Sequence, residues 1–410
     1  MIALLIGRNC ALKLIPRVER FKKGELMSKI LTSGAVLLMT TAPIMAGGIE
    51  RAPQSLAVLF EQGNYAELSF GGVDPTVEGT DVAGFKTGDV AQGYGFAGLS
   101  YKHQFNDNLS AAFIMEQPFG ADIRYPTAPD GSPVLGGTRV EVNSTTITAL
   151  ARYKFENNFS VHGGIRASKA DGGVTLDGLG YSRIAPPYDL TIEDEWGTGY
   201  VIGAAYEIPE IAARVSLTYN SPIEHDFRMI ETGNVILGAT NGLTDTITGR
   251  YTVKTPRSWT LEGQSGVAQD TLVFGSIRWV KWSEFLVDNG VFPITTPTGG
   301  TVPLVEVEDT TTYTIGVGRK FTENWSGSLS FLYEAKEGDT VSPLAPTNGR
   351  KGVTLAAIYT MDNIKITTGI NYTKLGGSDL GIGETGNKTR VATMDDNHAW
   401  GVGVRIGYSF

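Results

Sequence analysis

The last twelve residues, AWGVGVRIGYSF (399–410), alternate strictly between two kinds of side chain. After Ala399 the odd positions are small, apart from Arg405, whereas the even positions are all apolar or aromatic. A period of two residues belongs to a β-strand, in which successive side chains point to opposite faces, and not to a helix with its period of 3.6. The pattern predicts that the chain ends in a two-faced strand whose last residue is an aromatic, Phe410.

Similar stripes recur along the chain and lie in pairs. Clear examples are residues 158–168, 211–219, 325–333 and 363–374. Short turns rich in Asn, Asp and Pro join the paired stripes, at 105–109, 155–159, 207–211, 266–270, 321–325 and 361–364. Long polar stretches rich in Gly and Pro separate the pairs, at 75–90, 121–138, 171–194, 221–245, 286–305, 336–350 and 375–396. Tight turns and long loops therefore alternate from one end of the chain to the other.

This alternation predicts an antiparallel meander. Because every second connection lies at the same end, six tight turns and seven long loops give fourteen strands, with both termini at the tight-turn end. An even strand number, short turns at one end, long loops at the other and outward apolar stripes are typical of outer-membrane barrels. Aromatic residues mark the ends of several stripes: Trp196, Trp325, Tyr372, Trp400 and Phe410. We therefore expect an all-β, fourteen-stranded antiparallel transmembrane barrel rather than a soluble β-sandwich, since the second faces of the strands carry charges.

The N-terminus has the pattern of an export signal. Residues 27–46 contain a Lys near the start, an apolar middle and small residues before Ala46, which is typical of a secretory signal peptide cleaved after Ala46 or Ala42. Residues 1–26 are interpreted as an upstream extension that precedes the true start, Met27. The only cysteine, Cys10, falls in this part. The remaining chain carries a net charge of about −14, which suits a bacterial envelope protein and argues against a nucleic-acid partner.

Several stretches resemble the long-chain fatty acid transporter family of the outer membrane, which also includes aromatic-hydrocarbon channels. The similarity is most specific in LSYKHQFNDNLSAAFIMEQPFG (99–120), in residues 195–227, in residues 255–263 with 278–285, and in the last strand. The resemblance implies a monomeric barrel with an N-terminal hatch inside its lumen and uptake of hydrophobic ligands from the outer loops. It also implies lateral exit through a gap at a kink in the third strand. The ending Tyr408 to Phe410 resembles the signal that the barrel assembly machinery recognises.

The hatch departs from the family pattern because it is short. Only residues 47–63 lie between the expected cleavage site and the barrel, which we place at 64–410. The stretch APQSL (52–56) is interpreted as standing where the family carries Asn-Pro-Ala, with Pro53, Gln54 and Leu56 as hatch residues. A gating mechanism that depends on the extreme N-terminus therefore does not transfer unchanged.

The third strand contains the candidate lateral opening. Its apolar stripe meets Glu116, Pro118, Phe119 and Gly120 in succession. Proline cannot donate to a strand ladder, and glycine marks bulges and close approaches, so we expect Pro118 to open a gap in the wall. The alternative is that Pro118 lies just beyond the membrane, where the strand becomes a loop.

Inward-facing cations are candidates for binding a fatty acid carboxylate. They are Lys154, His162, Arg166, Arg214 and Arg405. A charge facing the lumen meets water, whereas one facing lipid costs several kcal/mol at mid-depth. The alternative is a set of structural ion pairs. Three oddly apolar loops, 184–190, 229–239 and 285–294, are candidates for first contact with a hydrophobic ligand, or for packing on each other as a lid.

The sequence gives no support for an enzyme. GYGFAG (93–98) and GIGETG (381–386) match a dinucleotide pattern but are followed by no helix, and the four histidines lack metal-ligand spacing. Ser160 and His162 share the inward face, which disfavours a lipase. We expect no cofactor and predict a passive outer-membrane channel for hydrophobic compounds, most of all long-chain fatty acids. The alternatives are an aromatic-hydrocarbon channel, a general diffusion porin, or an adhesin or phage receptor.

Overall fold

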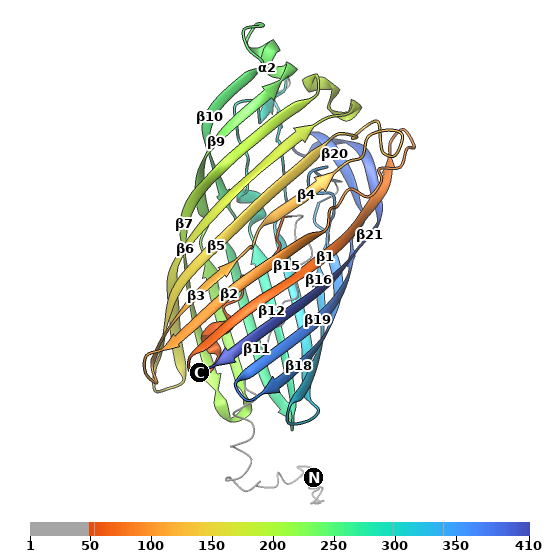
Figure 1. The fold of residues 1–410 in the computed structure, drawn as a ribbon. Coiled ribbons are helices and arrows are strands. Elements are labelled where there is room, and N and C mark those ends of the chain that lie inside the picture. Colours follow the sequence, from red (N-terminus) through yellow and green to blue (C-terminus); the bar gives the residue numbers. More distant parts are fainter. Residues whose placement is uncertain (1–48, 53, 298, 339) are drawn as a thin grey trace, which may run out of the picture.

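The computed structural model describes residues 49–52, 54–297, 299–338 and 340–410, and it is a closed antiparallel barrel (Figure 1). Its strands up to the middle of the chain are β1 (Tyr65–Asp81), β2 (Tyr94–Gln104), β3 (Leu109–Glu116), β4 (Gly120–Arg124), β5 (Arg139–Lys154), β6 (Phe159–Leu176), β7 (Tyr188–Ile208), β8 (Ala213–Asn220) and β9 (Ile223–Gly233). The later strands are β10 (Thr246–Thr255), β11 (Ser258–Ala268), β12 (Thr271–Val280), β13 (Ile294–Thr295), β14 (Thr301–Val302), β15 (Thr310–Lys320), β16 (Trp325–Glu334), β17 (Thr340–Val341), β18 (Arg350–Met361), β19 (Ile364–Leu375), β20 (Ser378–Glu384) and β21 (Asn387–Ser409). The short helices are η1 (Ala57–Phe60), η2 (Leu179–Ile184), η3 (Pro209–Ile211), α2 (Asn234–Ala239) and η4 (Trp282–Glu284).

The barrel closes where the first strand meets the last. Tyr65 of β1 lies opposite Lys102 of β2 on one side and Ser409 of β21 on the other. Four of the chain's passages through the wall are interrupted, so that β3 with β4, β8 with β9, β10 with β11, and β19 with β20 each form one passage. Counted in this way, the wall has the fourteen antiparallel passages that the turn pattern predicted, and the predicted fold is confirmed.

The six predicted tight turns all join neighbouring strands, but several predicted loops are largely strand. β9 and β10 lie within or beside the predicted loop 221–245, and β20 with the start of β21 occupies much of 375–396. The physical reason is that exposed charges pair across the neighbouring strands, for example Arg228 with Glu193 at 2.6 Å. Their polarity resembles that of a loop, although the backbone continues the sheet beyond the apolar belt.

An exposed apolar belt surrounds the wall and has aromatic residues near its edges. Tyr219 contacts Trp259 with ring centroids 4.7 Å apart, and Tyr372 contacts Trp400 at 4.8 Å. Near the tight-turn end, Phe410 stacks on Tyr408 at 5.7 Å. Such rows are typical of the two interfaces of a membrane barrel.

Among the residues that the structure describes, no helix has the length and apolar character needed to cross a membrane.

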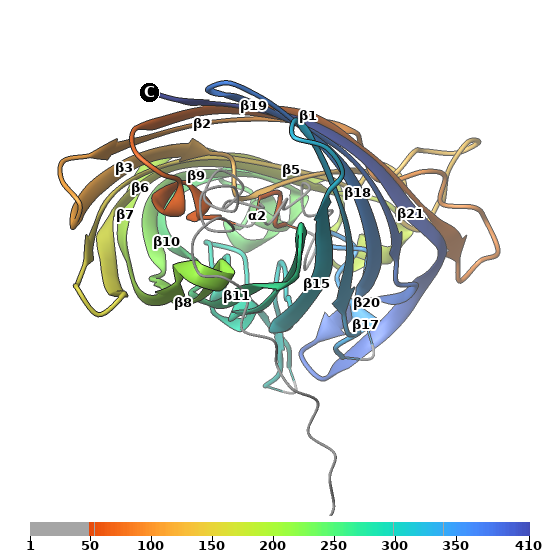
Figure 2. The ribbon, with the colours of Figure 1, turned by 90° about the horizontal axis from the view of Figure 1, so that it is seen from below.

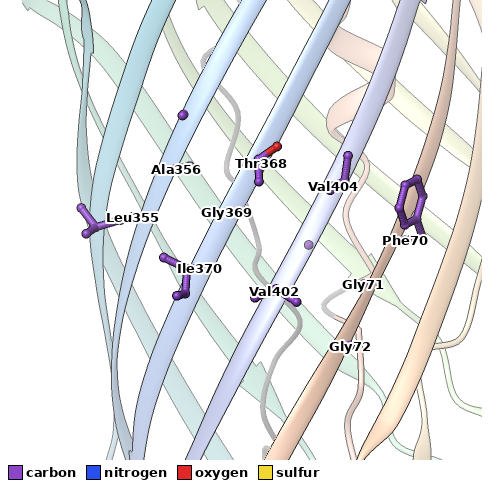
Figure 3. Close-up of a pocket in the computed structure, with 12 residues that line it drawn as sticks. Phe70, Gly71, Gly72, Leu355, Ala356, Thr368, Gly369, Ile370, Val402 and Val404 are labelled. Atoms are coloured by element: carbon purple, nitrogen blue, oxygen red, sulfur yellow. The ribbon is translucent and has the colours of Figure 1, made fainter.

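The belt contains a shallow hollow of about 600 Å³ where β1, β21, β19 and β18 run side by side (Figure 3). Gly71, Gly369 and Gly403 lie in its floor, and exposed side chains such as Phe70 and Val402 line it. The hollow forms because these glycines carry no side chain, so the wall is thin there.

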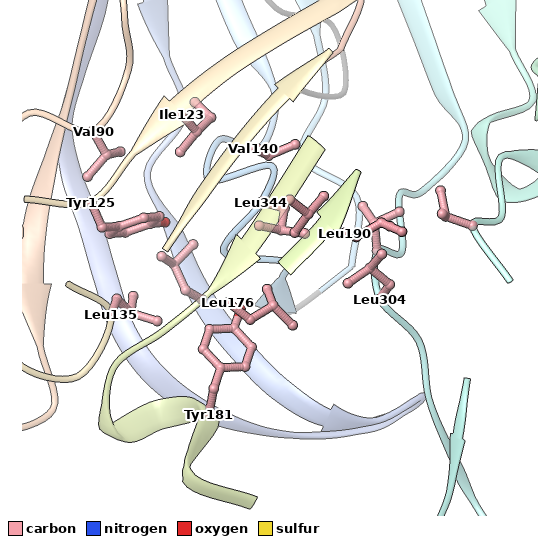
Figure 4. Packing of buried hydrophobic residues seen from close by; sticks show 14 of the residues in the cluster. Val90, Ile123, Tyr125, Leu135, Val140, Leu176, Tyr181, Leu190, Leu304 and Leu344 are labelled. Carbon is pink, nitrogen blue, oxygen red and sulfur yellow. The ribbon is translucent and has the colours of Figure 1, made fainter. Parts of the chain in front are cut away.

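Loops fill the lumen at the long-loop end and form the main hydrophobic core (Figure 4). All three apolar loops contribute buried residues to it, including Tyr188, Met229, Ile236, Val287 and Phe292. The loops therefore pack on each other and on the inner wall. A carboxylate anchors them, because fully buried Glu231 accepts hydrogen bonds from the Tyr188 hydroxyl at 2.9 Å and from two backbone N–H groups at Gly290 and Val291.

Candidate functional site

The third passage leaves the wall at the predicted proline. The ladder between β2 and β3 ends where Leu99 faces Met115, and pairing on this side resumes only at an isolated bridge between Ala91 and Ile123. Across the interval, the described residues show one link, from the Ala97 N–H to the Gln117 side chain at 3.2 Å. The wall therefore has a gap in its hydrogen bonding beside β2.

The strand kinks into the lumen at this gap and pairs there with the segment that precedes the barrel. The carbonyl of Pro118 accepts hydrogen bonds from the N–H groups of Arg51 at 2.7 Å and Ala52 at 3.1 Å. The Gly120 N–H donates to the carbonyl of Ile49 at 2.8 Å. Residues 49–52 and 54–63, which we call the N-terminal segment, lie inside the ring of strands (Figure 2).

Ser144 and Arg51 complete the contacts of the kink. The Ser144 hydroxyl donates to the Phe119 carbonyl at 2.6 Å, and the Ser144 hydroxyl oxygen in turn accepts a hydrogen bond from the Phe119 N–H at 2.9 Å. The guanidinium of Arg51 lies 4.5 Å from the centre of the Tyr94 ring, on the β2 side of the gap. The N-terminal segment thus covers the inner side of the gap.

A narrow apolar cavity of about 90 Å³ lies against the kink, inside the barrel. Fully buried Trp282 meets the Phe119 ring edge-on at 5.9 Å and the Phe285 ring at 6.2 Å. The other residues that line the cavity come from the wall strands, the N-terminal segment and the outer loops. They include Ile49, Ala121, Val142, Ile192, Phe227, Val253, Val287 and Leu304. The cavity therefore touches both the gap and the loop core.

A cluster of four charged side chains lies at this kink, and three of them, Glu50, Arg166 and Arg278, are buried. Glu50 and Arg278 form an ion pair in which the Arg278 Nη2 is 2.5 Å from the Glu50 Oε1. The Arg278 Nη1 donates to the hydroxyls of Ser258 at 3.0 Å and Thr260 at 3.1 Å. Glu116, the last residue of β3, interacts electrostatically with both Arg278 and Arg166. Two carboxylates and two guanidinium groups thus share one buried region.

The remainder of the N-terminal segment plugs the tight-turn end of the lumen. Leu56 and Leu59 pack on wall residues such as Ile114 and Leu150. The ring of Phe60 lies between two guanidinium groups, with Arg152 at 4.5 Å and Arg214 at 4.0 Å. Two lysines hold the chain that follows: the Lys102 Nζ donates to the Glu61 carbonyl at 2.5 Å, and Lys365 forms an ion pair with the Glu61 carboxylate at 2.8 Å.

Four of the five predicted ligand cations have protein partners. Arg214 contacts Phe60, Lys154 lies 3.8 Å from the carboxylate of Glu207, Arg405 pairs with Glu67 at 3.2 Å, and the His162 Nε2 lies 3.1 Å from the Thr218 hydroxyl. Two of the five carry a buried nitrogen without a hydrogen-bond partner among the described residues, namely the Arg166 Nη2 atom and the His162 Nδ1 atom. Of these two, Arg166 belongs to the charge cluster at the kink.

The predicted hatch residues fall into different environments. Gln54 is buried with a positive φ of 57°, and Leu56 packs in the plug. Pro53 lies outside the described residues. Sequence reasoning missed Glu50, Arg278 and Trp282, although RWVKWSEF (278–285) was among the stretches that carried the family resemblance.

Comparison with known proteins shows which family this barrel belongs to. The family model described as "Outer membrane protein transport protein (OMPP1/FadL/TodX)" matches residues 48–410. The chain belongs to this family. A long-chain fatty acid transport protein of Escherichia coli strain K12 is 20% identical over 411 residues, which cover 89% of each chain.

Solved structures of the family share the fold. A Pseudomonas aeruginosa FadL homologue has a TM-score of 0.71 at 15% identity and covers 86% of this chain and 92% of its own. The Pseudomonas putida toluene transporter TodX has a TM-score of 0.60 at 13% identity, with the same two coverages. The protein is thus an outer-membrane barrel of a family of transport channels for hydrophobic compounds, which is not a family of enzymes.

Proposed function

We propose that this protein is a passive channel that takes up long-chain fatty acids and leads them sideways into the membrane. The observation that carries the proposal is the position of the apolar cavity, which adjoins the gap at Pro118 on one side and the loop core on the other. Binding sites for apolar ligands are typically concave and apolar with a few polar groups at fixed positions. The described residues that line the cavity include no arginine or lysine, but Ile49 and Phe119 connect it to the neighbouring charge cluster, whose guanidinium groups suit a carboxylate.

The route follows from this arrangement. A ligand contacts the apolar outer loops, moves between them into the cavity, and leaves through the gap beside Pro118. The N-terminal segment acts as the hatch (residues 47–63), because its plug around Phe60 closes the direct path along the lumen. The barrel works as a monomer, and its last residue guides assembly in the outer membrane.

An aromatic hydrocarbon is the second candidate ligand. It is favoured by the rings of Phe119, Trp282 and Phe285, which meet edge-on at the cavity. A general diffusion porin is disfavoured, because packed loops and the plug fill both ends of the lumen.

The test is uptake of labelled oleate by cells that lack the protein and by cells in which it is restored. We expect restoration to raise oleate uptake, and excess toluene to compete only if aromatic hydrocarbons share the route. Equal oleate uptake with and without the protein, together with restored entry of small polar antibiotics, would contradict the proposal and support a porin.

A further inference from the structure

We propose that the outer face of the wall carries a binding site for a phosphorylated, acylated lipid of the outer leaflet. Lys351 and Lys374 bind the phosphate, and the hollow over β1, β21, β19 and β18 holds an acyl chain. The site faces the membrane rather than the lumen, so it is independent of the ligand that the channel carries.

The two lysines lie directly opposite each other on neighbouring strands. Lys351 of β18 is the register partner of Lys374 of β19, and both side chains are exposed. They point outward, because they alternate with buried residues of the inner face such as Arg350 and Leu375. Like charges directly opposite each other destabilise a strand pair. An anion shared by the two ammonium groups would remove this repulsion.

The lysine pair is not neutralised by the protein. Among the described residues, neither lysine forms an ion pair or a side-chain hydrogen bond, and Lys351 lies 5.8 Å from the centre of the Tyr333 ring. Asp74 of β1, an outward carboxylate at this end of the belt, is separated from Lys374 by β21.

Exposed lysines elsewhere on the wall differ in this respect. At the same end of the barrel, Lys169 pairs with Asp194 at 2.9 Å and Lys254 pairs with Glu224 at 2.7 Å. The unneutralised charge of Lys351 and Lys374 therefore sets this face apart and is complementary to an anionic group.

Aromatic rings place the two lysines at the depth of lipid headgroups. Lys351 is the second residue of β18 and Lys374 the last but one of β19, so both lie at the long-loop ends of their strands. Next to them on the membrane side, the Tyr372 and Trp400 rings contact each other with centroids 4.8 Å apart. Such rings mark the boundary between headgroups and hydrocarbon in a membrane barrel.

The hollow continues the same strands into the hydrocarbon region (Figure 3). Leu355 and Ile370 line it, and each is four residues from one of the lysines, which is about 13 Å along a strand. The lysines and the hollow are thus arranged like the headgroup and the chain of one lipid molecule.

The membrane supplies molecules that have both features. Acyl chains surround the belt on every side, and lipid phosphates lie at the level of the aromatic rings. A lysine near a membrane surface strengthens the binding of an anionic lipid by about fivefold, so two lysines predict a preference of about 25-fold over a neutral lipid. A chain in the hollow adds apolar contact and lies across the seam where β1 meets β21.

The experiment measures lipid binding to the full purified protein by native mass spectrometry. The probes are lipid A with its phosphates and the same acylated glycolipid with the phosphates removed. We expect the wild type to bind one molecule of the phosphorylated form about 25-fold more tightly than the dephosphorylated form. Excess inorganic phosphate should not displace it, because free phosphate has no acyl chain to place in the hollow.

Two matched double variants test the lysines. Lys351→Gln combined with Lys374→Gln should lose the preference for the phosphorylated lipid. Lys169→Gln combined with Lys254→Gln removes the same charge from exposed lysines that have carboxylate partners, and it should keep the preference. The heat-modifiable mobility of a folded barrel, which both should retain, confirms that each variant is assembled.

A third variant tests the hollow. Gly72 lies on the outward face between Phe70 and Asp74, and a Cβ atom there would meet only the Tyr94 carbonyl oxygen, at 3.6 Å. Gly72→Leu therefore fills the hollow without a clash. It should weaken binding of the phosphorylated and dephosphorylated lipids by a similar factor of severalfold.

The outcomes that would overturn the site are distinct. Equal binding of the two lipids by the wild type, or a preference retained without Lys351 and Lys374, would show that these lysines do not select a phosphate. Unchanged binding by Gly72→Leu would exclude the hollow as the place of the chain. A dimer in the mass spectrum that excludes lipid A would assign this face to a second copy of the protein. None of these results depends on oleate uptake, so the proposed function is tested separately.

Discussion

Glu50 and Arg278 are 228 residues apart in the chain, yet they form an ion pair buried inside the barrel. The pair joins the N-terminal segment to β12, on the far side of the lumen from the first strands. Because Glu50 is flanked by backbone contacts to the kinked third passage, the pair also fixes the inner cover of the gap in the wall. A single long-range contact thus relates the hatch, the cavity and the candidate exit.

Restoring a regular third strand should slow transport. In Pro118→Val the new N–H can pair with β2, which favours an unbroken ladder across the gap. We expect oleate uptake to fall severalfold while the folded barrel remains abundant. Pro222→Val is the matched control, since Pro222 interrupts the passage between β8 and β9 away from the kink. Unchanged uptake in Pro118→Val would remove the kink from the mechanism.

Freeing the outer loops should ease ligand entry. Glu231→Ala removes the acceptor for Tyr188 and for the N–H groups of Gly290 and Val291. We expect faster hydrogen exchange at 286–292 and a higher initial rate of oleate capture by intact cells. Glu224→Ala, an exposed carboxylate on the same strand, is the control. If exchange rises but capture does not, the loops do not limit entry.

One lumen ion pair should stabilise the barrel strongly. Glu334 and Arg350 are buried with a separation of 3.1 Å, and the Thr312 hydroxyl donates to the same carboxylate at 2.6 Å. Glu334→Gln removes the carboxylate that pairs with this buried guanidinium and should lower the free energy of unfolding by about 3–5 kcal/mol. Urea titration of the barrel in lipid vesicles measures this loss.

The exposed pair between Lys254 and Glu224, at 2.7 Å, provides the comparison. Its Glu224→Gln variant should change the free energy of unfolding by less than about 1 kcal/mol, because water screens the interaction. Equal effects of the two substitutions would show that burial does not set the strength of these pairs.

Deleting Phe410 should impair assembly more than transport. Its N–H donates to the Asn64 carbonyl at 3.1 Å, and its ring stacks on Tyr408 and on Tyr101, so it joins the two ends of the barrel. We expect a smaller heat-modifiable fraction in the outer membrane, with normal oleate uptake per folded barrel. Phe410→Tyr retains the ring and should assemble normally. Full assembly of the deletion would exclude the terminal aromatic as a signal.

The sequence by itself determined the strand count and the two faces of each strand. The stripe from Trp400 to Phe410 and its counterparts depend only on the period-two geometry of an extended chain, which is a local property. The tight turns are equally local, because Asn, Asp and Pro set their backbone angles. Pro118 was identified for the same reason, since a missing N–H interrupts a ladder wherever it lies. Charged hairpin extensions such as β9 and β10 were mistaken for loops, because polarity alone does not distinguish an exposed strand from a loop.

Only the tertiary structure decided which side chains meet. Lys154, Arg214 and Arg405 face the lumen as their positions in the stripes indicate, but their partners Glu207, Phe60 and Glu67 come from other strands or from the N-terminal segment. Likewise, no local pattern relates Glu50 to Arg278 or places Trp282 against Phe119. The physical reason is that alternation fixes the direction of a side chain, whereas its partner depends on strand register and barrel closure, which are set by contacts between distant parts of the chain.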